Sequence, residues 1–297
     1  MRVSFLGLGV MGYPMAGHLA KAGFDVRVYN RTTSKAQQWV ADYIDETDYT
    51  GQAFTTVAEC VDGADVVLVC VGNDDDVRSV TTSEIGALAH MKAGAILVDH
   101  TTTSANLAEE LLEACTKAQL RFMDAPVSGG QAGAENGVLT VMCGGEASDF
   151  DAMQSVFKAY AKSSVLMGKA GQGQRAKMVN QICIAGALTG LSEGLLLAEK
   201  SGLDVQTLVD CLKNGAAGSW QMENRAQTMA QDKFDFGFAI DWMIKDLGFC
   251  LEEAKQHNLT LPLTQASTDA YKALSEEGLG RMDTSVLLKA IRKQAES

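Results

Sequence analysis

The chain has 297 residues, of which 46% are hydrophobic and 21% are charged. This length allows two domains of ordinary size, and the composition is that of a globular protein rather than a disordered or fibrous one. The formal net charge of −12 argues against nucleic acid or an anionic membrane surface as a partner. If the protein binds anions, it must hold them through backbone N–H groups and a few local cations.

The sequence predicts no membrane-spanning stretch and no secretory signal, and its cysteines and histidines are not clustered. No stretch approaches the roughly 20 apolar residues of a membrane helix, so we expect no membrane span. Met1–Leu6 leads directly into a glycine-rich turn, without the charged region and cleavage site of a secretory signal. The seven cysteines and four histidines are dispersed, which favours buried thiols in the cytoplasm over disulfides and predicts no metal site.

The first half of the chain alternates short apolar runs with amphipathic stretches. Helices are clearest over 11–22 and 106–118. Strands are predicted at the apolar runs 3–6, 26–29, 66–71, 96–99, 121–123 and 139–143, with 164–167 as a further candidate. Continuous apolar strands separated by helices predict a parallel sheet with both faces covered.

The second half reads as helical. A long proline-free run at 174–201 is followed by helical patterns at 204–214, 240–257, 263–277 and 284–295. The fold class is therefore α/β, with a doubly wound parallel sheet over residues 1–168 and an all-helical domain over residues 169–297.

The motif Gly7-Leu8-Gly9-Val10-Met11-Gly12 fits GxGxxG, follows a predicted strand and opens a predicted helix. Its first glycine suits a tight turn, its second lets a pyrophosphate approach the backbone, and its third allows close helix–strand packing. The setting predicts a dinucleotide site, and a glycine-rich turn in another α/β protein is the alternative.

The second strand ends at Asn30-Arg31-Thr32, where an NAD site usually has an acidic residue on the ribose 2′-hydroxyl. A guanidinium pairs with a 2′-phosphate, whereas a carboxylate repels it. The sequence therefore predicts NADP(H), with NAD(H) as a weaker possibility, and Arg31 as a plain exposed loop residue is the alternative.

Two further strand ends carry polar candidates. Val71 ends the predicted strand at 66–71, and with the following Gly72 and Asn73 it is a candidate cofactor contact. The acidic residues after Asn73 favour helix capping. In Thr101-Thr102-Thr103-Ser104, capping by Ser104 and a nicotinamide contact by Thr102 are equally supported.

The strand at 121–123 leads into Asp124-Ala125-Pro126-Val127-Ser128-Gly129-Gly130. A Ser-Gly-Gly turn presents consecutive backbone N–H groups, which suit a carboxylate; a plain flexible turn is the alternative. Lys177 and Asn180 lie three apart on one helix face that continues as apolar residues. General acid–base catalysis accounts for a lysine there, and a lysine extending its amine from a helix end is the alternative.

Asp241 and Lys245 lie four apart on another predicted helix, as in a surface ion pair, and a cleft-lining lysine is the alternative. The aromatic residues Trp220, Phe238 and Trp242 are expected in the core rather than in a pocket.

Together, Gly7–Gly12, Asp124–Gly130, the Gly171-x-Gly-x-x-x-Lys-x-x-Asn180 pattern and Lys245-Asp246-Leu247 resemble the β-hydroxyacid dehydrogenase family, nearly end to end. That family includes 3-hydroxyisobutyrate dehydrogenase and tartronate semialdehyde reductase. The resemblance implies a Rossmann-type domain joined by a long helix to an all-helical domain, and a homodimer or homotetramer. Bulky Trp220 and Trp242 depart from the family pattern and leave the substrate open.

The resemblance also implies a role for each site residue. Lys177 is the implied catalytic acid/base and Asn180 the substrate-orienting amide. Ser128, Gly129 and Gly130 would bind the substrate carboxylate. Lys245 and Thr102 would contact the nicotinamide end of the cofactor, and Lys245 would also bind the substrate. The implied reaction is hydride transfer between NADP(H) and a short 3-hydroxy acid or semialdehyde.

Two other functions are weighed against this one. The first is a glyoxylate or succinic semialdehyde reductase of the same family, and the second is a non-catalytic NADP-binding sensor or interaction module. An ordinary lysine, with a pKa near ~10.4, is already an acid at neutral pH, so reduction is the favoured direction.

Overall fold

The computed structural model describes residues 1–296. They form two compact units, one from Met1 to Lys177 and the other from Met178 onward. The helix α8 (Gln172–Ser201) begins in the first unit and continues into the second. The division therefore falls inside this helix, beyond the predicted boundary at 168/169. The reason is that the first turn of α8 is bonded to the first unit: the Gln174 side-chain nitrogen donates to the Thr101 carbonyl oxygen at 2.8 Å.

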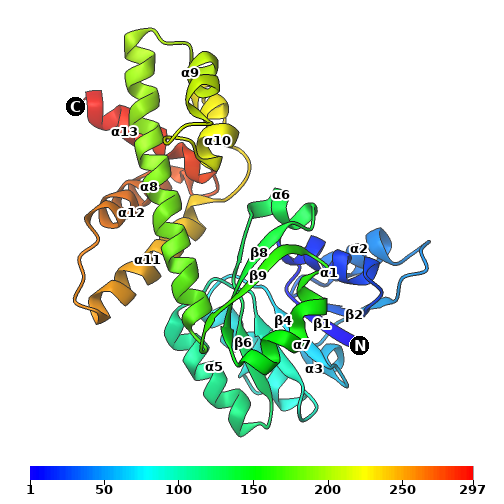
Figure 1. Cartoon of the computed structure of the whole chain (residues 1–297). Helices are drawn as coiled ribbons and strands as arrows, with labels where there is room; N and C mark the ends of the chain where they lie inside the picture. Colours follow the sequence, from blue (N-terminus) through cyan, green and yellow to red (C-terminus); the bar gives the residue numbers. More distant parts are fainter. Residues whose placement is uncertain (297) are drawn as a thin grey trace. The chain divides into compact units, whose positions relative to one another are not determined.

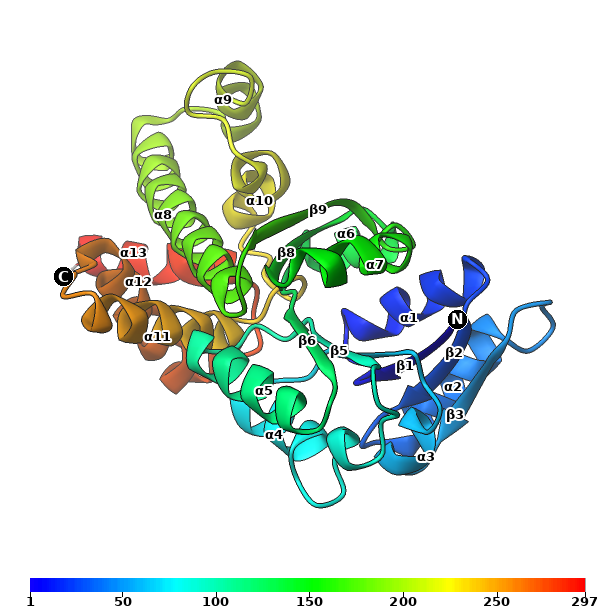
Figure 2. The same cartoon turned by 60° about the horizontal axis from the view of Figure 1, so that its bottom comes forward.

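The first unit is a nine-stranded sheet with helices on both sides (Figures 1 and 2). Its strands are β1 (Arg2–Leu6), β2 (Asp25–Tyr29), β3 (Gly51–Phe54), β4 (Val66–Val69), β5 (Ile96–Asp99), β6 (Arg121–Asp124), β7 (Val127–Ser128), β8 (Leu139–Gly145) and β9 (Ala161–Gly168). Its helices are α1 (Gly12–Lys21), α2 (Thr33–Tyr43), α3 (Val57–Val61), α4 (Asp74–Thr81), α5 (Ala105–Lys117), α6 (Gly130–Glu135) and α7 (Ala147–Phe157).

The strand order is β3-β2-β1-β4-β5-β6-β8-β7, with β9 paired to β8. Neighbouring strands from β3 to β6 are parallel, which confirms the doubly wound α/β prediction for this part of the sheet. Beyond β6 the sheet is mixed, because β8 runs antiparallel to β6 and β7 but parallel to β9. The strands β3 and β7 were not predicted, since they are short and β3 has no β-branched residue.

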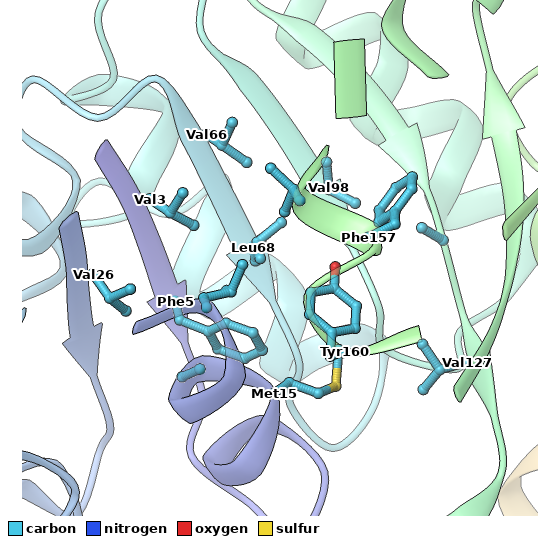
Figure 3. Packing of buried hydrophobic residues seen from close by; sticks show 14 of the residues in the cluster. Val3, Phe5, Met15, Val26, Val66, Leu68, Val98, Val127, Phe157 and Tyr160 are labelled. Carbon is cyan, nitrogen blue, oxygen red and sulfur yellow. The ribbon is translucent and has the colours of Figure 1, made fainter. Parts of the chain in front are cut away.

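The residues of the central strands alternate between two hydrophobic clusters, one on each face. In β4, Val66 and Leu68 face the cluster that includes Met15 of α1 and Phe157 of α7 (Figure 3). Val67 and Val69 join the opposite cluster, with residues of α3, α4 and α5. Figure 2 shows α1 on one side of the sheet and α3, α4 and α5 on the other. A strand buried on both faces therefore reads as a continuous apolar run.

The second unit is helical, as predicted. It contains most of α8, together with α9 (Val205–Leu212), α10 (Trp220–Ala230), α11 (Ile240–Gln256), α12 (Pro262–Leu274) and α13 (Leu287–Glu296). The helix α10 was missed because its polar residues hide its apolar spacing. A π-helical turn, Ser275–Leu279, and a 3₁₀ turn, Thr284–Val286, connect α12 to α13.

A buried ion pair orders the loop before α11. The Arg225 Nε donates to Asp283 Oδ1 at 3.0 Å, and Asp283 Oδ2 accepts from the Phe238 backbone N–H at 3.0 Å. The Arg225 guanidinium also lies 4.7 Å from the Trp220 ring centre. Trp220 and Trp242 are 52% and 38% exposed, so the expectation that they belong to the core is wrong, because each covers a cation at the surface.

The helix α8 also corrects an expectation. By length and composition it could cross a membrane, with a mean hydropathy of 1.5 over its most apolar stretch, of which 33% is buried within the structure. The prediction that no stretch approaches this level overlooked that the leucine, isoleucine and alanine residues of this helix outweigh its few polar ones in the average. Glu193 is exposed and Ser192 is buried on the same helix, as in a helix that packs against other helices.

The cysteines are less uniformly buried than predicted. Cys60, Cys115, Cys143 and Cys250 are buried, whereas Cys183 and Cys211 are exposed, and none of the seven forms a disulfide. Cys183 lies on α8 and Cys211 on α9. Burial raises the pKa of the Cys60 thiol to about 12, which makes it a poor nucleophile.

Candidate active site

Sheet register brings five predicted site segments to one edge of the first unit. Leu6 pairs with both Tyr29 and Val69, Val69 pairs with Asp99, and Asp99 pairs with Asp124. These residues are the carboxyl ends of their strands, and the segments that follow them carry the site residues predicted from the sequence. In open α/β sheets, this edge is where ligands bind.

The glycine-rich loop after β1 is compact at two positions and open at the third. Gly7 has φ +102°, and a Cβ there would lie 2.2 Å from the Cys70 carbonyl oxygen. A Cβ at Gly12 would lie 2.1 Å from the Gly7 carbonyl oxygen. A Cβ at Gly9, in contrast, would meet no atom within 4 Å. The open space at Gly9 fits a pyrophosphate at the N-terminus of α1, whose first turn has no acidic residue.

Alanine substitutions at these glycines should separate folding from binding. Gly12→Ala should lower the free energy of unfolding by about 1–3 kcal/mol, because the added methyl group overlaps the backbone of the loop. Gly9→Ala should change it by less than about 0.5 kcal/mol but weaken nucleotide binding by at least about tenfold. Urea unfolding and calorimetric titration with NADP⁺ measure the two effects. Equal losses of stability in the two variants would contradict the assignment of Gly9 to the cofactor.

Asn30 serves the loop itself. Its Oδ1 accepts from the Leu8 backbone N–H at 2.9 Å, and its Nδ2 donates to the Thr32 carbonyl oxygen at 3.1 Å. The amide therefore joins the ends of β1 and β2. Arg31 is more exposed: its side chain is 89% accessible and forms an ion pair with Asp76 at 3.5 Å. Thr32 precedes the first turn of α2, where the N-terminal backbone N–H groups favour an anion.

The ends of β4 and β5 are tied together beside these residues. Val71 donates its backbone N–H to Thr101 Oγ1 at 3.1 Å. Asn73 caps α4 by accepting from the Asp76 N–H at 2.9 Å, and Ser104 caps α5 by accepting from the Leu107 N–H at 3.1 Å. Capping is thus confirmed for the acidic turn and for Ser104. Thr102 lies between these anchors and is partly buried.

The turn predicted to receive a carboxylate follows β6 and β7. Ser128 ends β7 and pairs with Thr140 of β8. Gly129 and Gly130 adopt φ +137° and +62°, values in the left-handed region that favours glycine. Both glycines are exposed, and Gly130 begins α6. The turn therefore has the backbone conformation and exposure that anion binding by N–H groups requires.

A buried histidine supports the start of this turn. His100 donates from Nδ1 to the Ala125 carbonyl oxygen at 2.6 Å, and its Nε2 accepts from the Tyr160 hydroxyl at 2.9 Å. Burial lowers the pKa of His100 to about 4, so the ring is neutral at pH 7. Sequence reasoning gave His100 no role, since its partners are distant in the sequence.

His100 should make the free energy of unfolding depend on pH below neutrality. The unfolded chain binds a proton at His100 below pH ~6.5, whereas the folded chain does so only near pH 4. His100 therefore costs stability as the pH falls through that window. Burial raises the pKa values of Asp99 and Asp124 to about 7 and 6, and these groups act in the opposite sense.

The histidine effect is isolated by comparing the protein with His100→Gln. The variant should be less stable at pH 7, and this deficit should shrink by about 2–3 kcal/mol at pH 4.5, because glutamine binds no proton. Urea unfolding at both pH values measures it. A deficit that is the same at both values would show that His100 does not titrate in this window.

Lys177 ends the first unit, on α8. Its side chain is 7% exposed, so the alternative of a lysine extending into solvent is not what the structure has. The helix begins against β6: Asp124 Oδ1 accepts from the Gly171 N–H at 2.7 Å and Oδ2 from the Gln174 N–H at 2.8 Å.

In the second unit, Asn180 and Lys245 are linked. Asn180 Nδ2 donates to Gln181 Oε1 at 2.8 Å, and Gln181 Nε2 donates to Asp246 Oδ2 at 2.6 Å. The Lys245 amine lies 3.3 Å from Asp246 Oδ1. Asp241 instead accepts from the Ser275 hydroxyl at 2.7 Å, so the lysine is held by its neighbour in sequence rather than by the predicted i,i+4 partner. Gln181 and Asp246 were missed as site residues, although the Lys-Asp-Leu motif contains one of them.

Two family models match the chain. One, described as the NAD binding domain of 6-phosphogluconate dehydrogenase, matches residues 2–168 and so spans more than half of the chain. The other, described as NAD-binding of NADP-dependent 3-hydroxyisobutyrate dehydrogenase, matches residues 171–291. The chain belongs to the β-hydroxyacid dehydrogenase family.

Full-length relatives agree with this membership. An uncharacterized oxidoreductase of Shewanella frigidimarina (strain NCIMB 400) is 51% identical over 292 residues, 98% of each chain. A probable 3-hydroxyisobutyrate dehydrogenase-like 1, mitochondrial, of Arabidopsis thaliana is 39% identical, over 98% of this chain and 85% of the relative. The structure of 3-hydroxyisobutyrate dehydrogenase of Mycobacterium tuberculosis with L-serine superposes with a TM-score of 0.87 at 29% identity, over 98% and 99% of the two chains. The protein is an NAD(P)-dependent hydroxyacid dehydrogenase that acts on CH–OH groups.

Proposed function

We propose that this dehydrogenase uses NADPH to reduce a short semialdehyde that carries a carboxylate, or oxidises the matching 3-hydroxy acid in reverse. The observation that carries the proposal is the buried Lys177 side chain, 7% exposed, on a helix that Asp124 joins to the strand before Ser128–Gly130. An amine and a carboxylate receptor held by one framework suit a substrate with a carboxylate near its carbonyl group.

The residues divide the reaction among them. Bound NADPH supplies the hydride that the carbonyl carbon accepts. Lys177 donates a proton to the carbonyl oxygen as charge develops there. The N–H groups of the Ser128–Gly130 turn hold the carboxylate, and Asn180 orients the oxygen by a hydrogen bond. Thr102 contacts the nicotinamide end of the cofactor.

The NADP preference rests on the end of β2. Asn30 is neutral and occupied with the glycine-rich loop, while Arg31 is exposed and only weakly paired. A guanidinium in this position can form two parallel hydrogen bonds to a 2′-phosphate, in bidentate geometry. A preference for NAD is disfavoured because this chain has no acidic residue at the end of β2 to bind a free ribose 2′-hydroxyl.

A substrate panel tests the proposal. NADPH oxidation is followed by absorbance with methylmalonate semialdehyde, tartronate semialdehyde, succinic semialdehyde and glyoxylate, and the reverse reaction with 3-hydroxyisobutyrate and L-serine. Butyraldehyde is the matched control without a carboxylate. We expect the fastest turnover with methylmalonate semialdehyde or tartronate semialdehyde, and little with the control. Faster turnover of glyoxylate or succinic semialdehyde would favour the alternative reductase. NADPH binding without turnover of any substrate would favour a non-catalytic sensor.

Self-association belongs to the same proposal. The second unit has an apolar groove of about 560 Å³ along α8, α9 and α10, lined by Gly186, Gly190 and Gly194 on α8. A Cβ at Gly190 would meet no atom within 4 Å, and Leu197 and Leu203 nearby are 69% and 54% exposed. A homodimer or homotetramer that buries this groove would account for these residues. Light scattering should show an oligomer that Gly190→Trp dissociates without unfolding; an oligomer unchanged by Gly190→Trp would place the interface elsewhere.

A further inference from the structure

We propose that Asp124 and Gln174 are positioning residues that fix the Lys177 amine relative to the carboxylate-binding turn and to Thr102. This inference rests on the proposed function. We call the two residues the strand–helix clamp, because one lies at the end of β6 and the other in the first turn of α8. All the contacts that define the clamp lie within the first unit.

Asp124 caps a helix that begins far along the chain. It accepts hydrogen bonds from Gly171 and Gln174, which are 47 and 50 residues away in sequence. Helices are ordinarily capped by the residue just before their first turn. Here the cap comes from the strand that leads, four residues later, to Ser128. A displacement of this carboxylate would therefore shift the helix start against the turn.

Gln174 extends the clamp to a third strand end. Its Nε2 donates to the Thr101 carbonyl oxygen at 2.8 Å, and its Oε1 accepts from the Thr103 N–H at 3.1 Å. The two bonds hold the backbone on either side of Thr102. Gln174 is completely buried and lies three residues before Lys177, one helical turn away on the same side.

Steric contacts make the junction rigid. A Cβ at Gly144 of β8 would lie 2.4 Å from Asp124 Oδ1, and a Cβ at Gly173 would lie 2.5 Å from the Met142 carbonyl oxygen. The start of α8 is therefore in direct backbone contact with β8 while Asp124 bonds it from β6. Such close packing leaves little freedom for the helix to slide, and proton transfer depends on sub-ångström placement of the donor.

The junction requires a side chain that accepts two hydrogen bonds from the start of α8. Burial raises the pKa of Asp124 to about 6, against the lowering effect of the bonds from the helix N–H groups. A buried charge of this kind costs free energy that an uncharged residue would not. The carboxylate is, however, a side chain that can accept from two diverging N–H groups at once.

The test compares Asp124→Asn and Gln174→Met with Asp149→Asn. In Asp124→Asn the new NH₂ group faces one of the helix N–H donors, and in Gln174→Met both bonds to the 101–103 backbone are lost with little change in volume. Asp149 is a control because it is a carboxylate of the same unit, 6% exposed, and its partner is Arg121 at the opposite end of β6. Each variant is assayed for kcat, for NADPH affinity and for amide hydrogen exchange over residues 168–178.

We expect kcat to fall about 10–100-fold in both clamp variants, with NADPH affinity within about twofold and faster exchange at the start of α8. Asp149→Asn should keep its kcat and its exchange in this segment, even if it lowers the melting temperature. A folded clamp variant with near-normal kcat would overturn the inference. If Asp124→Asn does not fold, Gln174→Met decides alone.

Failure of the proposed function would be visible separately. If the unmodified protein reduces none of the substrates in the panel, the function is wrong, and the clamp is judged by exchange alone. Faster exchange confined to residues 168–178 in both clamp variants supports it. Exchange rates equal to those of the unmodified protein overturn it.

Discussion

Lys177→Ala should lower kcat by about 10²–10⁴-fold while leaving the affinity for NADPH within about twofold. The alanine removes the proton donor to the carbonyl oxygen, so only water can protonate the developing alkoxide. The effect falls on the chemical step because the amine interacts with the oxygen more strongly in the transition state than in the ground state. The glycine-rich loop, by contrast, belongs to other strands and is unchanged. Steady-state rates and titration with NADPH measure the two quantities.

Two variants control this prediction. Lys177→Arg keeps the positive charge but cannot release its proton readily, because the guanidinium pKa exceeds about 12; its kcat should therefore also fall. Lys162, which is exposed on β9 of the same unit, should tolerate alanine without loss. A Lys177→Ala protein that is folded and turns over at a near-normal rate would remove this lysine from the mechanism.

Arg31→Ala should lower kcat/KM for NADPH by about 10–100-fold and change that for NADH by less than about twofold. A charge-assisted hydrogen bond contributes about 1.5–3 kcal/mol, and each 1.4 kcal/mol corresponds to about a factor of ten. The Arg31 side chain is 89% exposed and its ion pair with Asp76 is long, 3.5 Å, so little must be broken before it binds a phosphate. Rates with both reduced nucleotides measure the effect.

Asp76 offers the matched control. It competes for the Arg31 guanidinium, so Asp76→Asn should leave NADPH binding equal or tighter, in the direction opposite to Arg31→Ala. Asn73 would still cap α4 through the backbone N–H of residue 76. If Arg31→Ala lowers kcat/KM equally for NADPH and NADH, the arginine contacts a part of the nucleotide that both share. A preference of the unmodified protein for NADH would contradict the NADP(H) prediction itself.

Local patterns were sufficient wherever neighbouring residues decide the structure. The glycine spacing at Gly7–Gly12 predicted the strand–turn–helix unit, because only glycine fits where the loop contacts Cys70 and its own backbone. Apolar runs located seven of the nine strands, counting the candidate at 164–167 that is β9, since buried parallel strands carry few polar residues. The spacing of Lys177 and Asn180 placed both on one face of α8.

Sequence patterns gave wrong predictions where the environment of a residue depends on parts of the chain that are distant in sequence. The exposure of Trp220 and Trp242 depends on what packs against each ring, and the sequence does not state this. The strand β3 and the helix α10 also escaped, because their residues have weak preferences that neighbouring elements override.

The sequence by itself determined the fold class, the family and the residue types of the site, because each depends on spacings of a few residues. Tertiary structure alone decided that Asp124 caps a helix 47 residues further on, that His100 reaches Tyr160, and that Gln181 joins Asn180 to Asp246. These bonds depend on strand register and helix packing, which form only when the whole chain folds. Their donors and acceptors are common residue types that no short pattern distinguishes from surface ones.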